Sequence, residues 1–493
     1  MPGFLVENFG CRATQADGAA LERQFEEQGY SRASAPREAS VVVLNTCTVT
    51  AGADQDARAA IRRVRRQNPD ARIIVTGCYA QRAPEEIAAL PGVDLVVGNS
   101  HKHQLAEIVL GNSAVASRRS AFVSLSQLTE HRELRTENSI FISDIFAHTE
   151  LIAAPVFDAA NERTRPNLKI QDGCDNRCSF CVIPFVRGQS RSMKPERIVH
   201  EVNTLVNAGY REVVISGINL GRWGRDLDLG PQTSDLGHGA TRDTGSSSIH
   251  VETAALGRPG EQSSPATLVE LIDSILSETA LEKLRISSVE PMDWSDELIS
   301  LVATSPRIAK HAHVPMQSGS DAVLRRMHRK YRPWHYCEKI EKIRAAMPGA
   351  AIGADVMVGF PGETDFEFEE TRRMIEDLPF TYLHVFTYSP RPGTPAAEMR
   401  DQVPVPVARE RNRVLRELAS EKKLAFMRSF IGKSVEAITL NVSGLDADGE
   451  FTECLTDNYL KLRVHGRRKA NLWIPVNVNN VVAGTLGGST YEG

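Results

Sequence analysis

The sequence predicts an α/β protein of three parts: an N-terminal parallel α/β sheet domain, a central partial (β/α)6 barrel and a small C-terminal β-barrel. Three observations support this prediction: apolar runs that alternate with helical patterns near the N-terminus, six further strand and helix units, and short alternating runs separated by Gly and Asn at the end. The predicted boundaries are residues 1–112 for the first domain, 113–160 for a connecting segment, 161–403 for the barrel, 404–429 for a connecting helix and 430–493 for the last domain.

Three apolar runs in the first domain each end in a cysteine. Cys11 closes LVENFGC, Cys47 closes VVVLNTC and Cys78 closes RIIVTGC, with helical patterns near 15–28 and 51–67 between them. In a β-α-β-α-β succession the strands are parallel, so their carboxyl ends share one edge of the sheet. We therefore expect these distant thiols to converge, although a lone buried cysteine is more often inert.

The central domain is predicted from six candidate strands. These are NLKIQ, EVVISG, LRISSV, AHVPMQ, AIGADVMVGF and YLHVFTYS, and helical patterns follow them, as at 195–206 and 365–377. Six parallel units form a partial barrel, whose chemistry is expected at the carboxyl ends of the strands. A stretch rich in Gly, Ser, Thr, Asp and Pro at about 225–265 predicts a flexible insertion, because it offers too little apolar surface to offset the entropy of ordering.

The connecting helix and the last domain complete the chain. Leu415, Leu418 and Phe426 fall on one helical face, which should pack on the barrel. The following short strands carry a basic cluster near Tyr459, which predicts phosphate contacts and a stacking ring for RNA. A solvated basic turn is the alternative. The candidate RNA-binding residues are Tyr459, Lys461, Arg463, Arg467, Arg468 and Lys469.

A loop after the first barrel strand carries three more cysteines. Cys174, Cys178 and Cys181 form C-x-x-x-C-x-x-C within KIQDGCDNRCSFCVIPFVRG. Three thiolates on one short loop suit an iron-sulfur cluster, because they leave one coordination position open. The alternative is a zinc loop completed by a remote fourth ligand. Cys337 and Cys454 lack such a context, and we expect both to be structural.

Composition narrows the class of protein. The chain has 493 residues and a formal net charge of -4, so RNA contacts would have to come from local basic patches. No stretch is a membrane span and the first residues lack a signal-peptide pattern, which predicts a cytoplasmic protein without membrane association. Six cysteines in candidate ligand sets also suit a reducing compartment.

Taken together, these motifs resemble the radical S-adenosylmethionine methylthiotransferases. The matching stretches are NFGCRATQAD, VLNTCTVT, VTGCYAQ, KIQDGCDNRCSFCVIPFVRGQSRS, RISSVEP, HVPMQSGSD, GADVMVGFPGETD and FTYSPRPGTPAA. KIQDGC, RISSVEP and YLHVFTYSPRPGT resemble most the branch acting on N6-threonylcarbamoyladenosine in tRNA. Thr14 departs from the pattern, since the family usually has Asn there. The resemblance implies an N-terminal methylthiotransferase domain, a radical S-adenosylmethionine barrel and a TRAM-like RNA-binding domain.

The resemblance also implies cofactors. Two [4Fe-4S] clusters are expected, one on Cys174, Cys178 and Cys181, whose vacant iron binds S-adenosyl-L-methionine, and an auxiliary one on the three N-terminal cysteines. The first would generate a 5′-deoxyadenosyl radical. Several residues at strand ends are candidates for the cofactor pocket, although turn chemistry also explains most of the glycines among them. They are Phe180, Gly217, Ser288, Gln317, Ser318, Gly359 and Glu363.

The implied function is insertion of a methylthio group at carbon 2 of N6-threonylcarbamoyladenosine, 3′ of the anticodon. No acid or base residue is required, because the chemistry is radical. The expected partners are tRNA and an electron donor of the flavodoxin or ferredoxin type, and the sulfur source is left open. Alternatives are methylthiolation of isopentenyladenosine in tRNA or of a ribosomal-protein aspartate. A non-catalytic iron-sulfur RNA-binding regulator is a further alternative, but it predicts a degraded cysteine loop, which is not what the sequence shows.

Overall fold

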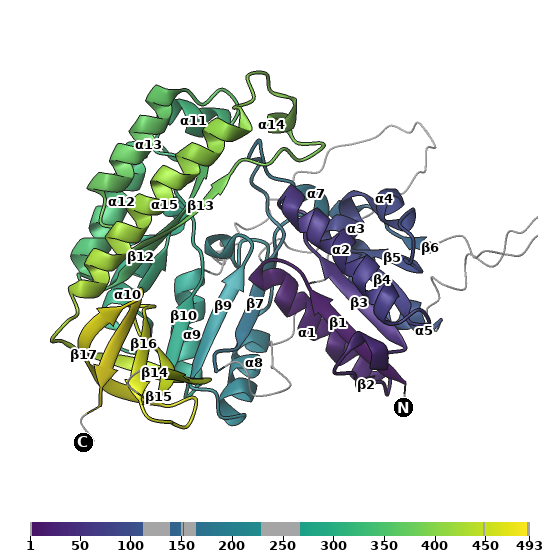
Figure 1. The fold of residues 1–493 in the computed structure, drawn as a ribbon, viewed down its shortest axis with the longest axis horizontal. Coiled ribbons are helices and arrows are strands. Elements are labelled where there is room, and N and C mark those ends of the chain that lie inside the picture. Colours follow the sequence, from purple (N-terminus) through teal and green to yellow (C-terminus); the bar gives the residue numbers. More distant parts are fainter. Residues whose placement is uncertain are drawn as a thin grey trace, which may run out of the picture.

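The computed structural model describes residues 2–111, 139–148, 151, 164–227, 267–446 and 449–490, which form three parts around a central half-barrel (Figure 1). The N-terminal sheet flanks the half-barrel on one side, and a small barrel lies at its base. None of the described helices combines the length and apolar character needed to cross a bilayer. The predicted α/β fold class is confirmed.

The N-terminal domain is a parallel sheet with strand order β2-β1-β3-β4-β5-β6. Helices α1 (Arg12–Glu27) and α5 (Leu105–Leu110) cover one face, and α2 (Ala51–Gln67) covers the other. Every residue of β3 is buried, as expected for a central parallel strand. β6 comes from the predicted connecting segment and extends the sheet by one strand. The strands are β1 (Gly3–Asn8), β2 (Ser31–Arg32), β3 (Val41–Thr46), β4 (Arg72–Gly77), β5 (Leu95–Gly98) and β6 (Ser139–Phe141).

The central domain contains the six predicted parallel strands. They form two sheets, β10-β9-β7-β8 and β11-β12-β13, linked only by isolated bridges such as Ser288 to His313 in the part of the chain that the structure describes. The sheets share one hydrophobic core, which lies between the strands and the outer helices, and they remain open between β8 and β13, which is the expected partial barrel. The strands are β7 (Asn167–Asp172), β8 (Arg191–Ser192), β9 (Glu212–Gly217), β10 (Lys283–Ile286), β11 (His311–His313), β12 (Ala351–Val358) and β13 (Tyr382–Thr387).

Helices cover the outer face of these strands. Leu168 and Ile170 of β7 face this helical layer and are fully buried in the core. Alternate residues of the same strand, such as Lys169, face inward because side chains alternate across a strand. The helices are α8 (Pro195–Asn207), α9 (Leu268–Glu278), α10 (Asp296–Thr304), α11 (Asp321–Arg326), α12 (Pro333–Ala346) and α13 (Asp365–Asp377).

Helix α15 (Val405–Arg428) packs along β13 and leads into the last domain (Figure 1). Leu415 is buried against the barrel core, as the stripe predicts. The last domain is a closed barrel with the order β14-β15-β16-β18-β17, and buried Cys454 belongs to its core. Its strands are β14 (Ser434–Asp446), β15 (Gly449–Thr456), β16 (Lys461–His465), β17 (Trp473–Val482) and β18 (Thr485–Ser489).

Two sequence expectations fall largely beyond these residues. The predicted insertion at about 225–265 lies outside the described residues from 228 onward, and so does most of the connecting segment 113–160.

Candidate active site with two cysteine sets

The three N-terminal cysteines lie at the carboxyl ends of neighbouring strands β1, β3 and β4. Cys11 precedes α1, and Cys78 begins the short helix α3 (Cys78–Arg82). Burial, together with the nearby Cys78 and Cys11, raises the pKa of Cys47 to about 12. Gly10, with φ +116°, leaves room for this approach, because a Cβ there would lie 3.0 Å from the Cys47 Sγ. The structure therefore brings these three thiols together.

The second cysteine set occupies the loop after β7. Gly173 starts the loop with φ +73°, where a Cβ would lie 1.8 Å from the carbonyl oxygen of Gln189, so only glycine fits. The backbone N–H of Asn176 donates to the Sγ of Cys174 over 3.4 Å, and the N–H of Cys181 donates to the carbonyl of Cys178 over 3.1 Å. Burial raises the pKa of Cys174 to about 11 and that of Cys181 to about 12. The loop thus collects three thiols that a bound metal group would convert to thiolates.

The spacing of ligand atoms separates a zinc site from a cluster site. Among the described residues, a single group of His, Cys, Asp and Glu has three ligand atoms within 4.8 Å of one another: His313, Asp355 and His384. A tetrahedral zinc ion, with Zn–S distances of about 2.3 Å, holds its sulfur ligands closer together than that. Neither cysteine set is arranged as a closed zinc site, whereas three thiols around an open position suit a [4Fe-4S] cluster.

Two polar residues that sequence reasoning missed contact the second set. Arg329 donates from Nη1 to the Sγ of Cys178 over 3.2 Å and also pairs with Glu290. Asn219, after β9, has its Nδ2 3.7 Å from the Sγ of Cys174. Both would favour the anionic form of a thiolate-bound group. Neither residue has a recognisable pattern in sequence, since each is brought to the loop from a distant segment.

Helix α7 (Ile183–Arg187) joins the two cysteine sets, because it starts two residues after Cys181 and packs on Cys78. Val182 and Val186 form an apolar contact with Cys78. Asn99 strengthens this junction by donating from Nδ2 to the carbonyl of Val186 over 2.7 Å and to the Sγ of Cys78 over 3.6 Å. The two sets are therefore held by one rigid contact between the first and central domains.

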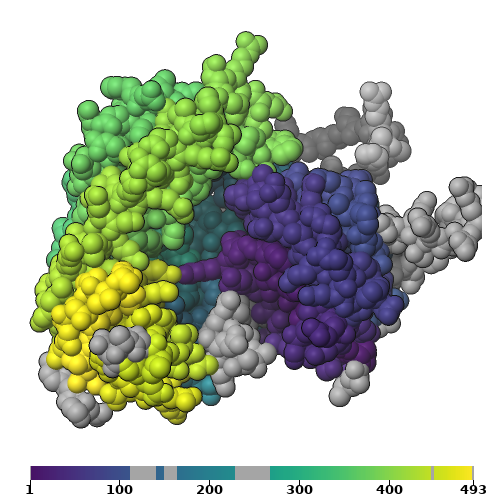
Figure 2. Space-filling model, viewed as in Figure 1, coloured from purple at the N-terminus to yellow at the C-terminus, as the bar shows by residue number. Residues whose placement is uncertain are grey.

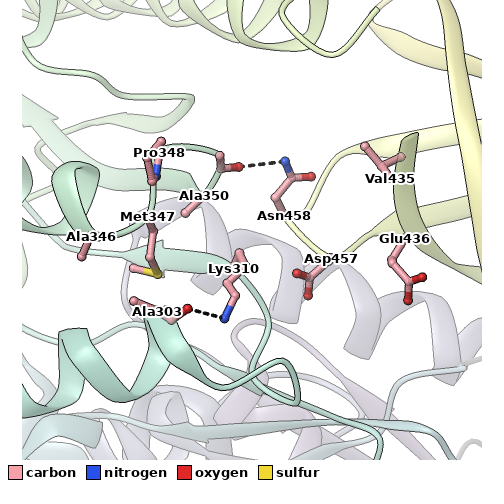
Figure 3. Close-up of a pocket in the computed structure, with 11 residues that line it drawn as sticks. Ala303, Lys310, Ala346, Met347, Pro348, Ala350, Val435, Glu436, Asp457 and Asn458 are labelled. Atoms are coloured by element: carbon pink, nitrogen blue, oxygen red, sulfur yellow. Dashed lines mark hydrogen bonds between the residues drawn. The ribbon is translucent and has the colours of Figure 1, made fainter. Parts of the chain in front are cut away.

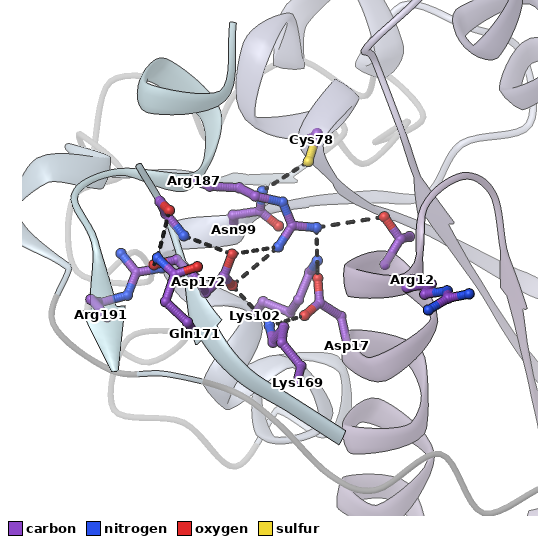
Figure 4. Close-up of polar contacts among 12 residues, drawn as sticks. Arg12, Asp17, Cys78, Asn99, Lys102, Lys169, Gln171, Asp172, Arg187 and Arg191 are labelled. Carbon is purple, nitrogen blue, oxygen red and sulfur yellow. Dashed lines mark hydrogen bonds and ion pairs between the residues drawn. The ribbon is translucent and has the colours of Figure 1, made fainter. Parts of the chain in front are cut away.

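A buried charge network supports this junction (Figure 4). Asp17 of α1 accepts hydrogen bonds from Lys102 and Arg187, at 3.1 Å and 3.0 Å, and from Lys169 of β7. Desolvation opposes the charge of Asp17, but the three cations hold its pKa at about 2. Two acids, Asp17 and Asp172, face four cations, the fourth being Arg191.

The network also reaches the first cysteine set. Arg187 lies 3.5 Å from the hydroxyl of Thr14, the position where the family pattern has Asn. The same hydroxyl is 3.6 Å from the Sγ of Cys11. Thr14 therefore keeps a polar contact between the guanidinium and this thiol. The excess positive charge beside three thiols suits an anionic group bound there.

The structure divides the candidate cofactor-pocket residues into two kinds. Ser318 and Glu363 are buried within the protein's own bonds, since Ser318 contacts Thr371 and Glu363 accepts from Arg411 and from the N–H of Gly359. The others lie at the carboxyl ends of strands or in the cysteine loop: Phe180, Gly217, Ser288, Gln317 and Gly359. The buried Oε1 of Gln317, at φ +64°, has no hydrogen-bond partner among the described residues, so this end of the barrel retains polar capacity for a ligand.

The C-terminal basic residues differ in whether they are exposed or paired within the protein. Lys461, Arg467 and Lys469 are exposed. Arg463 pairs with Glu453 and stacks on Phe451, and Arg468 donates to Thr490.

Tyr459 does not lie among these exposed cations. Its ring lies 4.7 Å from that of His311 and 5.9 Å from that of Tyr382, at the base of the half-barrel. Both neighbouring rings are tilted against the half-buried Tyr459 ring, by 40° and 43°, so its role in stacking on RNA stays a prediction.

A pocket of about 360 Å³ lies between the half-barrel and the last domain (Figure 3). Lys310 crosses it with hydrogen bonds to the end of α10, including the carbonyl of Ala303, and Asn458 donates to Gly349. The pocket is lined mostly by backbone turns and lies before the start of β11, away from both cysteine sets. It belongs to the junction between domains.

Comparison with known proteins agrees with this geometry. Two family models match: Uncharacterized protein family UPF0004 over residues 3–98 and the Radical SAM superfamily over residues 168–375. The threonylcarbamoyladenosine tRNA methylthiotransferase MtaB of Bacillus subtilis is 35% identical over 471 residues, covering 94% of this chain and 91% of that protein. The chain belongs to the radical S-adenosylmethionine methylthiotransferase family.

Further relatives bear on the branch and the fold. The protein of the same name from Aquifex aeolicus is 34% identical over 95% of this chain and 98% of its own length. A tRNA-2-methylthio-N(6)-dimethylallyladenosine synthase of Endomicrobium trichonymphae is 31% identical over 97% and 96%. The solved radical S-adenosylmethionine methyltransferase TsrM of Kitasatospora setae has a TM-score of 0.52 at 14% identity, over 80% of this chain and 77% of its own, which shows the fold alone.

Proposed function

We propose that this chain inserts a methylthio group at carbon 2 of N6-threonylcarbamoyladenosine, the nucleoside 3′ of the tRNA anticodon. The observation that carries the proposal is the contact, through α7, between two sets of three cysteines. This arrangement occurs in a methylthiotransferase-family chain whose relatives of 34% and 35% identity are named for that nucleoside.

The two cysteine sets have different tasks in this proposal. Cys174, Cys178 and Cys181 would hold a [4Fe-4S] cluster that binds S-adenosyl-L-methionine, and the three N-terminal cysteines would hold an auxiliary cluster that supplies sulfur. When bound, S-adenosyl-L-methionine and the cluster on Cys174, Cys178 and Cys181 supply abstraction of a hydrogen atom from carbon. Such chemistry is needed because the hydrogen on carbon 2 of adenine is not acidic enough for a general base.

The chain's own residues would position and charge-balance these groups. Arg329 and Asn219 donate toward the sulfurs of the second set, which stabilises their thiolate forms. Arg187 places a buried positive charge beside the first set and fixes α7 to α1 through Asp17. In this proposal, the contact between the domains keeps both sites beside one adenine.

Partners follow from the same proposal. The target base must leave its stack, which costs little in an anticodon loop. Lys461, Arg467 and Lys469 offer exposed phosphate contacts on the terminal barrel. An external donor of the flavodoxin or ferredoxin type would supply electrons, and we place the reaction in the cytoplasm, where tRNA is modified.

Nucleoside mass spectrometry tests the proposal. Cells that lack the gene should lose 2-methylthio-N6-threonylcarbamoyladenosine and accumulate its unmethylthiolated precursor. The wild-type gene should restore the product, and Cys47→Ala or Cys178→Ala should not. Cys337→Ala is the matched control, because this half-buried helical thiol lies outside both sets, and it should restore the product. Loss of the 2-methylthio form of dimethylallyladenosine instead would assign the chain to the other tRNA branch.

A further inference from the structure

A hollow separates the N-terminal domain from the C-terminal part of the chain. Figure 2 shows it between the purple first domain and the light green and yellow segments, with the teal central domain at its floor. Inward-facing residues of β11, β12 and β13 include His313 and Asp355, which are half-buried, and His384, which is exposed. The Nε2 of His313 lies 3.4 Å from Oδ1 of Asp355.

Arg12 reaches from the first domain toward this wall. It directly follows Cys11 at the start of α1, and its Nη2 donates to the hydroxyl of Tyr459 in the last domain over 3.4 Å. Its backbone carbonyl accepts from Asn167 of β7. Burial lowers the pKa of His384, and the positive charge of Arg12 lowers it as well. The Arg12 guanidinium therefore lies near the open wall of the half-barrel. In Figure 4 the Arg12 side chain points away from the buried charge network.

Among the described residues, Arg12 lacks the carboxylate partner that two neighbouring arginines have. Arg285 and Arg165 both pair with Glu212, at 2.6 Å and 3.5 Å. Within the described part of the chain, no carboxylate lies within 4.0 Å of the Arg12 guanidinium, and the Tyr459 hydroxyl is its hydrogen-bond acceptor. A half-buried guanidinium in this state favours an anionic ligand, because carboxylates form short charge-assisted hydrogen bonds with it.

We propose that Arg12 binds the carboxylate of the threonylcarbamoyl group and so selects this substrate class over adenosines with apolar N6 substituents. The inference rests on the proposed function, since threonylcarbamoyladenosine carries a carboxylate and dimethylallyladenosine does not. Arg12 directly follows Cys11 in the chain, so recognition of the carboxylate involves the segment that carries the first cysteine set. An apolar substituent would desolvate the guanidinium and offer it no balancing negative charge, which penalises the wrong substrate.

The test measures how tightly the reconstituted full-length enzyme binds three anticodon stem-loops. One carries threonylcarbamoyladenosine, one carries its threonine methyl ester and one carries unmodified adenosine. Wild type should bind the acid about tenfold to a hundredfold more tightly than the ester, the range expected for a hydrogen bond to a charged group. Arg12→Gln should abolish this preference, and Arg12→Lys should retain part of it. Arg23→Gln on the same helix, where Arg23 faces Glu201 at 4.0 Å, is the control and should match wild type.

Two results would overturn the inference. If wild type binds acid and ester equally, no cation recognises the carboxylate. If Arg12→Gln keeps the full preference for the acid, the recognising cation is another residue. In either case, methylthiolation of the acid stem-loop by wild type, followed by mass spectrometry, shows whether the proposed function still stands. Wild type that methylthiolates only a dimethylallyladenosine stem-loop overturns both proposals.

Discussion

Replacing Asp17 by Asn should destabilise the contact between the first and central domains. Asp17 is 2% exposed and binds Lys102, Lys169 and Arg187, so Asp17→Asn leaves these cations with Asp172 as their remaining acid in the network. Removal of one partner from a buried ion group costs about 3–5 kcal/mol, because the remaining charge stays desolvated.

The pKa of Asp17 gives an independent lower figure. Despite the opposing effect of burial, the cations hold the pKa at about 2, below the ordinary aspartate value near 4. A lowered folded-state pKa contributes stability above the unfolded-state pKa, and this contribution is lost as the pH falls from about 4 to about 2. It is therefore fully present at neutral pH, where it amounts to roughly 2 kcal/mol.

Urea denaturation at neutral pH, followed by circular dichroism on the cluster-free protein, measures this effect. Asp17→Asn should lower the midpoint clearly, whereas Glu410→Gln, which breaks an exposed pair with Arg413 on α15, should leave the midpoint close to that of wild type. Adding Lys102→Met to Asp17→Asn should recover part of the loss, because Lys102 pairs with no carboxylate other than Asp17 among the described residues. If Asp17→Asn and Glu410→Gln have equal midpoints, the buried network does not stabilise the domain contact.

Three further predictions concern the cysteine sets and the terminal barrel. After anaerobic reconstitution, the triple variant of Cys174, Cys178 and Cys181 to Ala should retain about half the iron and lose cleavage of S-adenosyl-L-methionine; full iron content would contradict the ligand assignment. The triple variant of Cys11, Cys47 and Cys78 to Ala should still cleave the cofactor but form no methylthio product, and normal product in a single-turnover assay would rule out a sulfur-supplying role. Neutralising Lys461, Arg467 and Lys469 should weaken tRNA binding. The slope of log affinity against log salt should also fall by roughly one for each cation that no longer binds a phosphate. An unchanged slope would place the RNA-binding surface elsewhere.

The sequence alone determined the features that depend on local pattern. Apolar runs that each end in cysteine predicted the parallel strands β1, β3 and β4, and the structure places Cys11, Cys47 and Cys78 at their shared edge. This worked because parallel topology aligns strand ends whatever the intervening sequence. The spacing of the second cysteine set likewise predicted a loop ligand set, since all three thiols come from one short segment.

The tertiary structure decided how the two sets communicate and which cations matter. Arg187 was not distinguished in sequence from other arginines, yet docking of α7 on the first domain places it against Asp17 and Thr14. Tyr459 was expected beside RNA, but closure of the terminal barrel against the half-barrel turns its ring toward His311. These roles depend on contacts between residues more than 140 positions apart, as the separations of 170 and 173 between Arg187 and its two partners show. Local periodicity carries no information on such contacts, because only packing of complete domains brings the side chains into range.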